Sequence, residues 1–101
     1  MLNIEYSGTA NEDMRELFYF IAHEKGMLIT AKNYLQGLKE KIEFIADNPT
    51  AFAITHHNSL LKYGLDVRRA NYKKMAIIYS IIEYDTIYIH RVVSANMITG
   101  L

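Results

Sequence analysis

The chain has 101 residues, of which 50% are hydrophobic, which is enough for a single compact domain over residues 1–101 but too few for two. Its 11 Lys and Arg residues equal its 11 Asp and Glu residues, and this zero net charge argues against nucleic acid as the main direct partner, although a local basic patch is allowed. The sequence has no cysteine, which excludes disulfides and thiolate metal sites, and no leader pattern or membrane-length apolar run, so we expect a cytoplasmic protein without a membrane anchor.

The N-terminal part predicts a short strand followed by an amphipathic helix. Apolar residues alternate with polar ones over residues 2–6, which is typical of a strand with one buried face. Thr9 and Glu12 then match a capping box at a helix start. Gly26 is well placed to end this helix. The apolar residues at the spacing of one helical face are Met14, Leu17, Phe18, Ile21 and Ala22.

A second helix is predicted from near Leu28 or Thr30 to about Asp47, where Pro49 stops it. Its inward stripe comprises Ala31, Tyr34 or Leu35, Leu38, Ile42, Ile45 and Ala46. Because only a few residues join the two helices, we expect them to pack as a hairpin.

The C-terminal third predicts a three-stranded meander, because it is rich in β-branched and aromatic residues and lacks proline. We expect strands at residues 65–70, 75–82 and 86–93, with turns at 71–73 and 83–85. Both faces carry bulky side chains, so the sheet should be covered. The predicted fold is therefore an α+β sandwich of two layers in the order β-α-α-β-β-β, with the helix hairpin on a mainly antiparallel sheet.

In the last expected strand, alternation sorts the side chains onto two faces. Arg91 shares the inward face with Ile87 and Val93, so we interpret it as a structural arginine that pairs with a helix carboxylate or extends its head group to solvent. His90 lies on the other face, where we expect a partly buried histidine with its hydrogen bonds satisfied.

Residues 50–62 are the least regular segment, and they contain the adjacent histidines His56 and His57. Neighbouring side chains diverge on most backbones, and the sequence offers no further ligands beside them. We therefore predict no metal site and no cofactor.

Positive charge gathers on the first expected hairpin, at Arg68, Arg69, Lys73 and Lys74. Arg68 and Arg69 face opposite sides of one strand, so we expect one to reach solvent and the other to pair with a carboxylate such as Asp66 or Glu83. Either arginine can be functional or structural on this pattern.

Tyr72 lies in the expected turn between Asn71 and Lys73, so it should be exposed. Most of the other tyrosines fall on or beside core-facing positions, which indicates packing. Tyr72 is thus the tyrosine to consider as a contact residue.

The first helix carries more apolar surface than one inward stripe can hide. Leu17, Tyr19 and Phe20 belong to a run of five apolar or aromatic residues, and Tyr19 and Phe20 cannot both lie on the stripe. Such a helix is either covered twice or exposes a surface that a partner covers.

The order of these motifs resembles the RelE/ParE superfamily of toxins from toxin–antitoxin modules, over nearly the whole chain. The resemblance comprises the helix-ending Ala-Asp-Asn-Pro at residues 46–49, the Asp-Val-Arg-Arg strand at 66–69, the Ile-Ile-Tyr-Ser-Ile strand at 77–81 and the Ile-Tyr-Ile-His-Arg-Val-Val strand at 87–93. It implies the fold derived above and a cognate antitoxin that folds onto the toxin.

One branch of the superfamily consists of RelE-like members. A resemblance to them implies a ribosome-dependent endoribonuclease of messenger RNA. Such a reaction needs a group that activates the 2′-hydroxyl, a proton donor and cations for the charge on phosphorus. Arg68 matches the strand arginine of the family, and Lys73 or Lys74 supplies a second cation. The basic residue and the tyrosine expected after the last strand are absent from residues 94–101. We therefore assign no catalytic residue and keep the ribonuclease as the alternative.

The other branch consists of ParE-like members. A resemblance to them implies that the protein inhibits DNA gyrase. ParE-like members end in a pattern like His-x-Ser-Met, which residues 94–97 match only at Met97, since Ser94 replaces the histidine and Asn96 the serine. A third possibility is a protein-binding module of the same fold without toxicity. Our leading hypothesis is a ParE-like toxin that is held by a ParD-like antitoxin in a hetero-oligomer, in which the toxin can also dimerise.

The site residues that follow from this hypothesis form two sets. The candidates for target binding are Arg68, Arg69, Tyr72, Lys73, Lys74, Asn96 and Met97. The candidates for antitoxin binding are Leu17, Tyr19 and Phe20.

Overall fold

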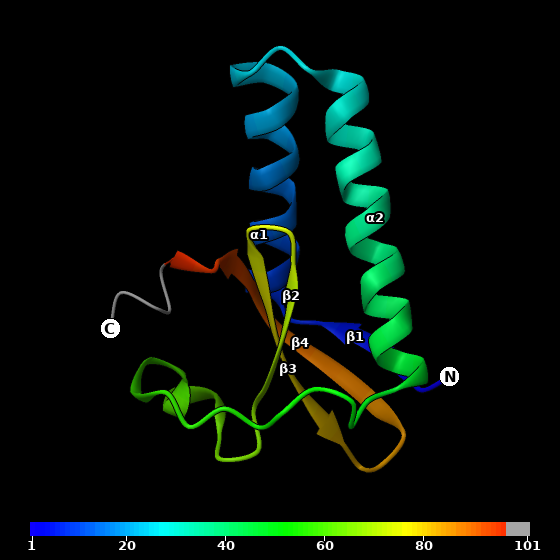
Figure 1. Cartoon of the computed structure of the whole chain (residues 1–101), viewed down its shortest axis with the longest axis vertical. Helices are drawn as coiled ribbons and strands as arrows, with labels where there is room; N and C mark the ends of the chain where they lie inside the picture. Colours follow the sequence, from blue (N-terminus) through cyan, green and yellow to red (C-terminus); the bar gives the residue numbers. More distant parts are fainter. Residues whose placement is uncertain (97–101) are drawn as a thin grey trace.

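A helix hairpin packs on one face of a mixed β-sheet in the computed structural model, which describes residues 1–96 (Figure 1). The elements are β1 (Asn3–Tyr6), α1 (Gly8–Tyr19), a π-helical turn η1 (Phe20–Glu24), α2 (Leu28–Asp47), a 3₁₀ helix η2 (Asn58–Tyr63), β2 (Arg68–Tyr72), β3 (Met75–Ile82) and β4 (Thr86–Ser94). The predicted α+β class and the order β-α-α-β-β-β are confirmed, with η1 and η2 as additions.

The sheet joins the two ends of the chain. Its strand order is β1-β4-β3-β2, in which β1 runs parallel to β4 and the other neighbours are antiparallel. Ile4 lies opposite Ile87, so the first strand depends on the last one for its hydrogen bonds. The predicted meander of β2, β3 and β4 is confirmed.

The first strand of the meander lies further along the chain than predicted. β2 covers Arg68–Tyr72 rather than residues 65–70, and Lys73 and Lys74 form the turn, with a φ of 53° at Lys73. Gly64 adopts a φ of 117° and Leu65 is exposed, so the chain reaches the sheet late. Tyr72 packs with the helix-side core, which keeps it in the strand and moves the turn forward.

The start of α1 corrects the predicted capping box. Ser7, not Thr9, is the N-cap, because its hydroxyl oxygen accepts a 2.8 Å hydrogen bond from the N–H of Ala10. The Ser7 hydroxyl also donates to the carbonyl of His90 at 2.8 Å, and its N–H donates to the carbonyl of Ile89. The end of β1 therefore fixes the helix start two residues earlier than the sequence pattern indicates.

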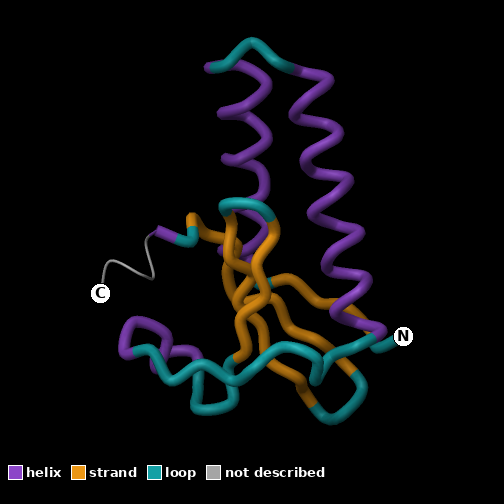
Figure 2. Tube along the Cα trace, viewed as in Figure 1, coloured by secondary structure: helices purple, strands orange, loops and turns teal. Residues whose placement is uncertain are grey.

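The hairpin between the helices is built as predicted. Gly26 adopts a φ of 63° just after η1, a conformation that glycine reaches without steric cost. α2 runs over Leu28–Asp47, and its C-cap residue Asn48 precedes Pro49. Figure 2 shows that the far ends of both helices extend beyond the sheet.

The main core lies between the helix hairpin and the sheet. The buried residues that form it are Ala10, Met14, Leu38, Ile42, Ile45, Ala46, Ala70, Ile77, Tyr79, Ile87, Ile89 and Val92. The hydroxyl of Tyr79 donates to the carbonyl of Pro49 at 2.8 Å, which ties the chain after α2 to the middle of the sheet.

A second, smaller cluster covers part of the other face of the sheet. It comprises Leu60, Val67, Ala76 and Ile78, with Tyr63 and Val93 packed against it. The short helix η2 supplies Leu60 and Tyr63, so the segment that appeared irregular in the sequence forms a cover for this face.

A β-bulge in β4 makes the predicted alternation wrong beyond Ile89. The register between β3 and β4 shifts at Ile78/Tyr79, so that Arg91 lies opposite Ile78 and Ile89 lies opposite Tyr79, while His90 has no opposite residue. One extra residue reverses the faces of all later side chains. Val92 therefore packs into the helix-side core, and Val93 packs against the second cluster.

Candidate functional site

The four cations of the β2–β3 hairpin form no salt bridge to a carboxylate within residues 1–96. We call Arg68, Arg69, Lys73 and Lys74 the cationic hairpin. The ion pairs in this part of the chain are those of the N-terminus with Asp47 and of Arg91 with Asp13. The predicted pairing of Arg68 or Arg69 with Asp66 or Glu83 is therefore wrong.

Arg68 is anchored by the backbone instead. Its Nη1 donates a 2.6 Å hydrogen bond to the carbonyl of Phe52, so it holds the loop that follows Pro49. The adjacent Tyr79 is buried, and this burial raises its pKa to about 12 although the charge of Arg68 acts in the opposite direction. Because its hydroxyl already donates to Pro49, Tyr79 is not placed to activate a substrate.

Of the other three cations, Arg69 lies in β2, and Lys73 and Lys74 form the turn of the hairpin. Arg69 donates from Nε to the side-chain oxygen of Asn71 at 3.0 Å. The ammonium of Lys73 lies 5.2 Å from the ring centre of Tyr34 and 5.5 Å from that of Tyr72, while Lys74 is exposed. A ring contact leaves the positive charge uncompensated, so the hairpin remains a cationic surface.

Tyr72 is half-buried, which corrects the prediction of an exposed turn tyrosine. Its ring packs edge-on against Tyr34 at 5.2 Å, and its hydroxyl lies where a Cβ on Gly37 would be. A glycine in α2 is thus required for the close approach of the hairpin to the helix. Tyr72 supports the cationic hairpin rather than extending from it.

The C-terminal candidates lie at the limit of the described chain. Asn96 is exposed two residues after β4. Met97 lies outside the described residues.

The predicted exposed surface of the first helix is present. We call Leu17, Tyr19 and Phe20 the α1 patch. Tyr19 is 60% exposed and Phe20 45% exposed, whereas Leu17 is half-buried against the core. The π-helical turn that begins at Phe20 widens the helix here, a feature that is frequent at functional sites.

Phe20 lies between two shallow grooves. One is lined by Arg15, Glu16, Tyr19 and Glu24, and the other by residues of α1, β3 and β4 that include Leu17, Met75 and Val93. An aromatic side chain between two grooves provides apolar area to a partner that crosses the helix.

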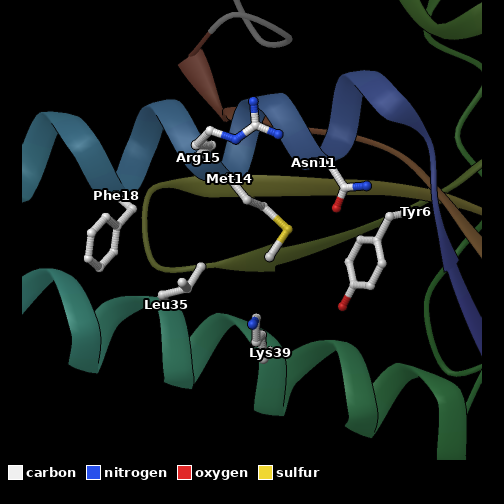
Figure 3. A pocket seen from close by; sticks show the side chains of 7 residues that line it. All are labelled: Tyr6, Asn11, Met14, Arg15, Phe18, Leu35 and Lys39. Atoms are coloured by element: carbon white, nitrogen blue, oxygen red, sulfur yellow. The ribbon is translucent and has the colours of Figure 1, made fainter.

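A cleft between the two helices was not predicted from the sequence. It has a volume of about 420 Å³ and is lined by Tyr6, Asn11, Met14, Arg15, Phe18, Leu35 and Lys39. In Figure 3 the side chains of Tyr6, Met14, Phe18 and Leu35 lie in the space between the helices, whereas the Arg15 guanidinium lies over α1. Periodicity assigned Phe18 and the Tyr34 or Leu35 position to the buried stripe, and it does not report where two helices diverge.

Arg91 has the structural role that was predicted for it. Its Nε and Nη2 donate to the two carboxylate oxygens of Asp13 at 2.8 and 3.1 Å, and Asp13 also accepts from the N–H of Val92. The Asp13 hydrogen bonds are the main reason that the pKa of Arg91 is raised further above its ordinary value. Asp13 thereby joins α1 to the edge of β4 beyond the end of β1.

His90 is a satisfied, partly buried histidine, as predicted. Its Nε2 lies 2.8 Å from the hydroxyl of Ser80, and its ring contacts the rings of Tyr63 and Tyr88 at 5.1 and 5.0 Å. Burial lowers its pKa from the ordinary value of 6.5.

His57 caps the short helix η2, because its Nδ1 accepts from the N–H of Ser59. Across residues 1–96, no three His, Asp or Glu side chains are grouped so that they could hold a metal ion. None of the helices in that range combines the length and the apolar character needed to cross a membrane.

The described residues thus present two distinct surfaces, the cationic hairpin and the α1 patch. His90 is engaged with Ser80 and Tyr79 with Pro49, while the tyrosines beside the hairpin cations are Tyr34 and Tyr72, whose rings lie next to Lys73. Fold and surfaces together define a RelE/ParE-like domain.

Comparisons with known proteins agree with this class. Residues 4–99 match the family described as the ParE toxin of type II toxin–antitoxin system, parDE. The structure is similar to a chain of the chromosomal ParDE toxin–antitoxin system from P. aeruginosa, with a TM-score of 0.68 and 13% identity, over 93% of this chain and 96% of that one. A search of curated proteins finds no match. The chain belongs to the ParE toxin family of type II toxin–antitoxin systems.

Proposed function

We propose that this ParE-family toxin inhibits DNA gyrase in the cytoplasm and that the cationic hairpin makes the contact with the target. The observation that carries the proposal is the group of cations without carboxylate partners in residues 1–96. Charges that no internal partner neutralises attract acidic surfaces of a partner and steer its approach. On this proposal, the part of gyrase that meets the hairpin is acidic.

Membership of a type II toxin–antitoxin family implies an antitoxin partner, and we propose that a ParD-like antitoxin covers the α1 patch. The exposed rings of Tyr19 and Phe20 support this assignment, because exposed aromatic area at the centre of a surface contributes most to binding. The two proposed surfaces differ in kind: the α1 patch is apolar and the hairpin is cationic.

The test of the target is a supercoiling assay with purified gyrase and relaxed plasmid. We expect the toxin to block supercoiling and to accumulate cleaved DNA. The double variant Arg69→Glu/Lys74→Glu should raise the concentration needed for half-inhibition by roughly tenfold or more, because like charges then meet the acidic partner. Lys32→Glu/Lys62→Glu, an equal change of charge at exposed positions of α2 and η2, is the control and should leave inhibition unchanged.

Two outcomes contradict this proposal. Normal supercoiling beside cleavage of message in a translation extract indicates the RelE-like ribonuclease instead. Normal supercoiling with intact message, and normal growth of cells that express the protein, indicates a binding module of the same fold.

A further inference from the structure

The outer edge of β2 is only partly covered by the rest of the chain. β2 is the terminal strand in the order β1-β4-β3-β2. The loop before η2 covers its beginning, where Ile54 bridges to Arg68 and the N–H of Thr55 donates to the carbonyl of Val67 at 2.8 Å. Beyond Arg69 the loop has left the edge.

Asn71 offers the unpaired backbone groups of this edge. Backbone groups along a strand point alternately to its two sides, so those of Asn71 point outward as the carbonyl of Val67 does. Within residues 1–96, no hydrogen bond involves the N–H or the carbonyl of Asn71. An exposed edge with free groups is a template for pairing with another strand.

The charges around the edge select the partner. Arg69, Lys73 and Lys74 flank Asn71, and a second copy of this chain would bring the same cations face to face, which is unfavourable across a strand pair. An extended segment with carboxylates meets these cations with opposite charge. The α1 patch lies beside β4, two strands away, so a protein bound there leaves this edge to another partner.

We propose that an extended, acidic segment of the toxin's target adds as a further strand along the β2 edge at Asn71. This inference rests on the proposed function, because it states how the cationic hairpin holds its target. The segment exchanges backbone hydrogen bonds with Asn71 and places carboxylates next to Arg69 on the outer face, where the Arg69 and Asn71 side chains already meet. Lys73, held over the rings of Tyr34 and Tyr72, receives a carboxylate on the face toward α2.

The experiment compares Asn71→Pro with Asn71→Ala. Both variants lose the side-chain amide that accepts from Arg69, but only proline loses the outward N–H, and the hydrogen bonds of Ala70 and Tyr72 with β3 are outside the change. We expect Asn71→Pro to need roughly tenfold more protein than Asn71→Ala for half-inhibition of gyrase. Equal inhibition by the two variants would overturn the strand addition.

A second measurement uses the unchanged protein and so does not depend on how the proline variant folds. Hydrogen exchange of the peptide that contains Asn71 is followed by mass spectrometry, alone and with gyrase. We expect exchange there to slow at least tenfold with gyrase, because a new hydrogen bond protects the amide. Protection by the antitoxin but not by gyrase would assign the edge to the antitoxin and overturn the inference.

Failure of the inference and failure of the proposed function give different results. A toxin that inhibits gyrase equally well in both variants, without protection at Asn71, contradicts the strand addition alone. An unchanged protein that leaves gyrase active contradicts the proposed function and, with it, the partner named here.

Discussion

At the scale of single residues, Asp13 connects α1 to β4, and no sequence motif indicates this connection. Its carboxylate accepts from two nitrogens of Arg91 and from the N–H of Val92, so one side chain joins α1 to the upper edge of β4. β1 covers the same edge of β4 over Thr86–Ile89. The Asp13 side chain therefore accepts a hydrogen bond from the β4 edge beyond the point where β1 ends.

We expect Asp13→Ala to lower the free energy of unfolding by about 2 kcal/mol, because Arg91 loses its partner and the N–H of Val92 loses its acceptor. Denaturant unfolding followed by circular dichroism measures this loss. The exposed neighbour Glu12→Ala is the control and should change stability by less than about 0.5 kcal/mol. A loss as small as that of the control would mean that the pair contributes little.

His90 gives the folded protein a dependence on pH. Burial lowers its pKa below 6.5, so around that pH the unfolded chain binds more protons than the folded one. Stability from this group is complete above its unfolded pKa and is lost as the pH falls toward the folded pKa. We expect the wild type to lose more stability than His90→Gln between about pH 7 and about pH 5. Parallel curves in denaturant unfolding at each pH would show that His90 does not cause the loss.

At the scale of elements, the sequence predicted what periodicity determines and missed what contacts determine. The helices, the meander and the order of elements follow from apolar spacing and from Gly26 and Pro49. The position of β2 depends on the contact of Tyr72 with Gly37, and the faces of Val92 and Val93 depend on a bulge at His90. Neither feature has a local sequence signal. Tyr72 and Gly37 lie far apart in the chain, and the bulge depends on how β4 pairs with β3.

The candidate site divides in the same way. Sequence reasoning located the cations and the exposed apolar residues of α1, because composition and helical spacing are local properties. It did not predict that Arg68 bonds to Phe52 or that Phe18 and Leu35 line a cleft. Those facts depend on where a loop and two helices lie after folding.

The α1 patch predicts an element-scale effect on the antitoxin. We expect Phe20→Lys to weaken antitoxin binding by roughly a hundredfold while the melting temperature changes by only a few degrees, because Phe20 is 45% exposed and contributes little to the core. Isothermal titration and thermal unfolding measure the two effects. Met14→Lys is the control that should unfold the protein, since Met14 is buried. Loss of both properties in Phe20→Lys would place Phe20 in the core.

At the scale of the whole molecule, the net charge is zero, but two surfaces differ in how they can bind a partner: one is cationic and the other is apolar. The hairpin concentrates cations without carboxylate partners in residues 1–96, whereas the α1 patch offers apolar rings. Attraction between exposed charges is screened by salt, but burial of apolar area is not.

We therefore expect salt to separate the two interactions. Raising NaCl from about 50 mM to about 300 mM should weaken gyrase binding by roughly tenfold or more and change antitoxin binding by less than about threefold. Affinity measurements for both partners over one salt series provide the comparison. Equal sensitivity of the two would mean that they share the cationic surface.

The pairing of β1 with β4 also determines when during synthesis the protein can become complete. The N-terminal strand leaves the ribosome first but must wait for Thr86–Ile89 before its hydrogen bonds can form, and Ser7 and Asp13 wait for residues 89–92. A nascent chain that stops before this strand cannot close its sheet. Premature termination before β4 thus yields an incomplete sheet, so this fold can form only after β4 has been translated.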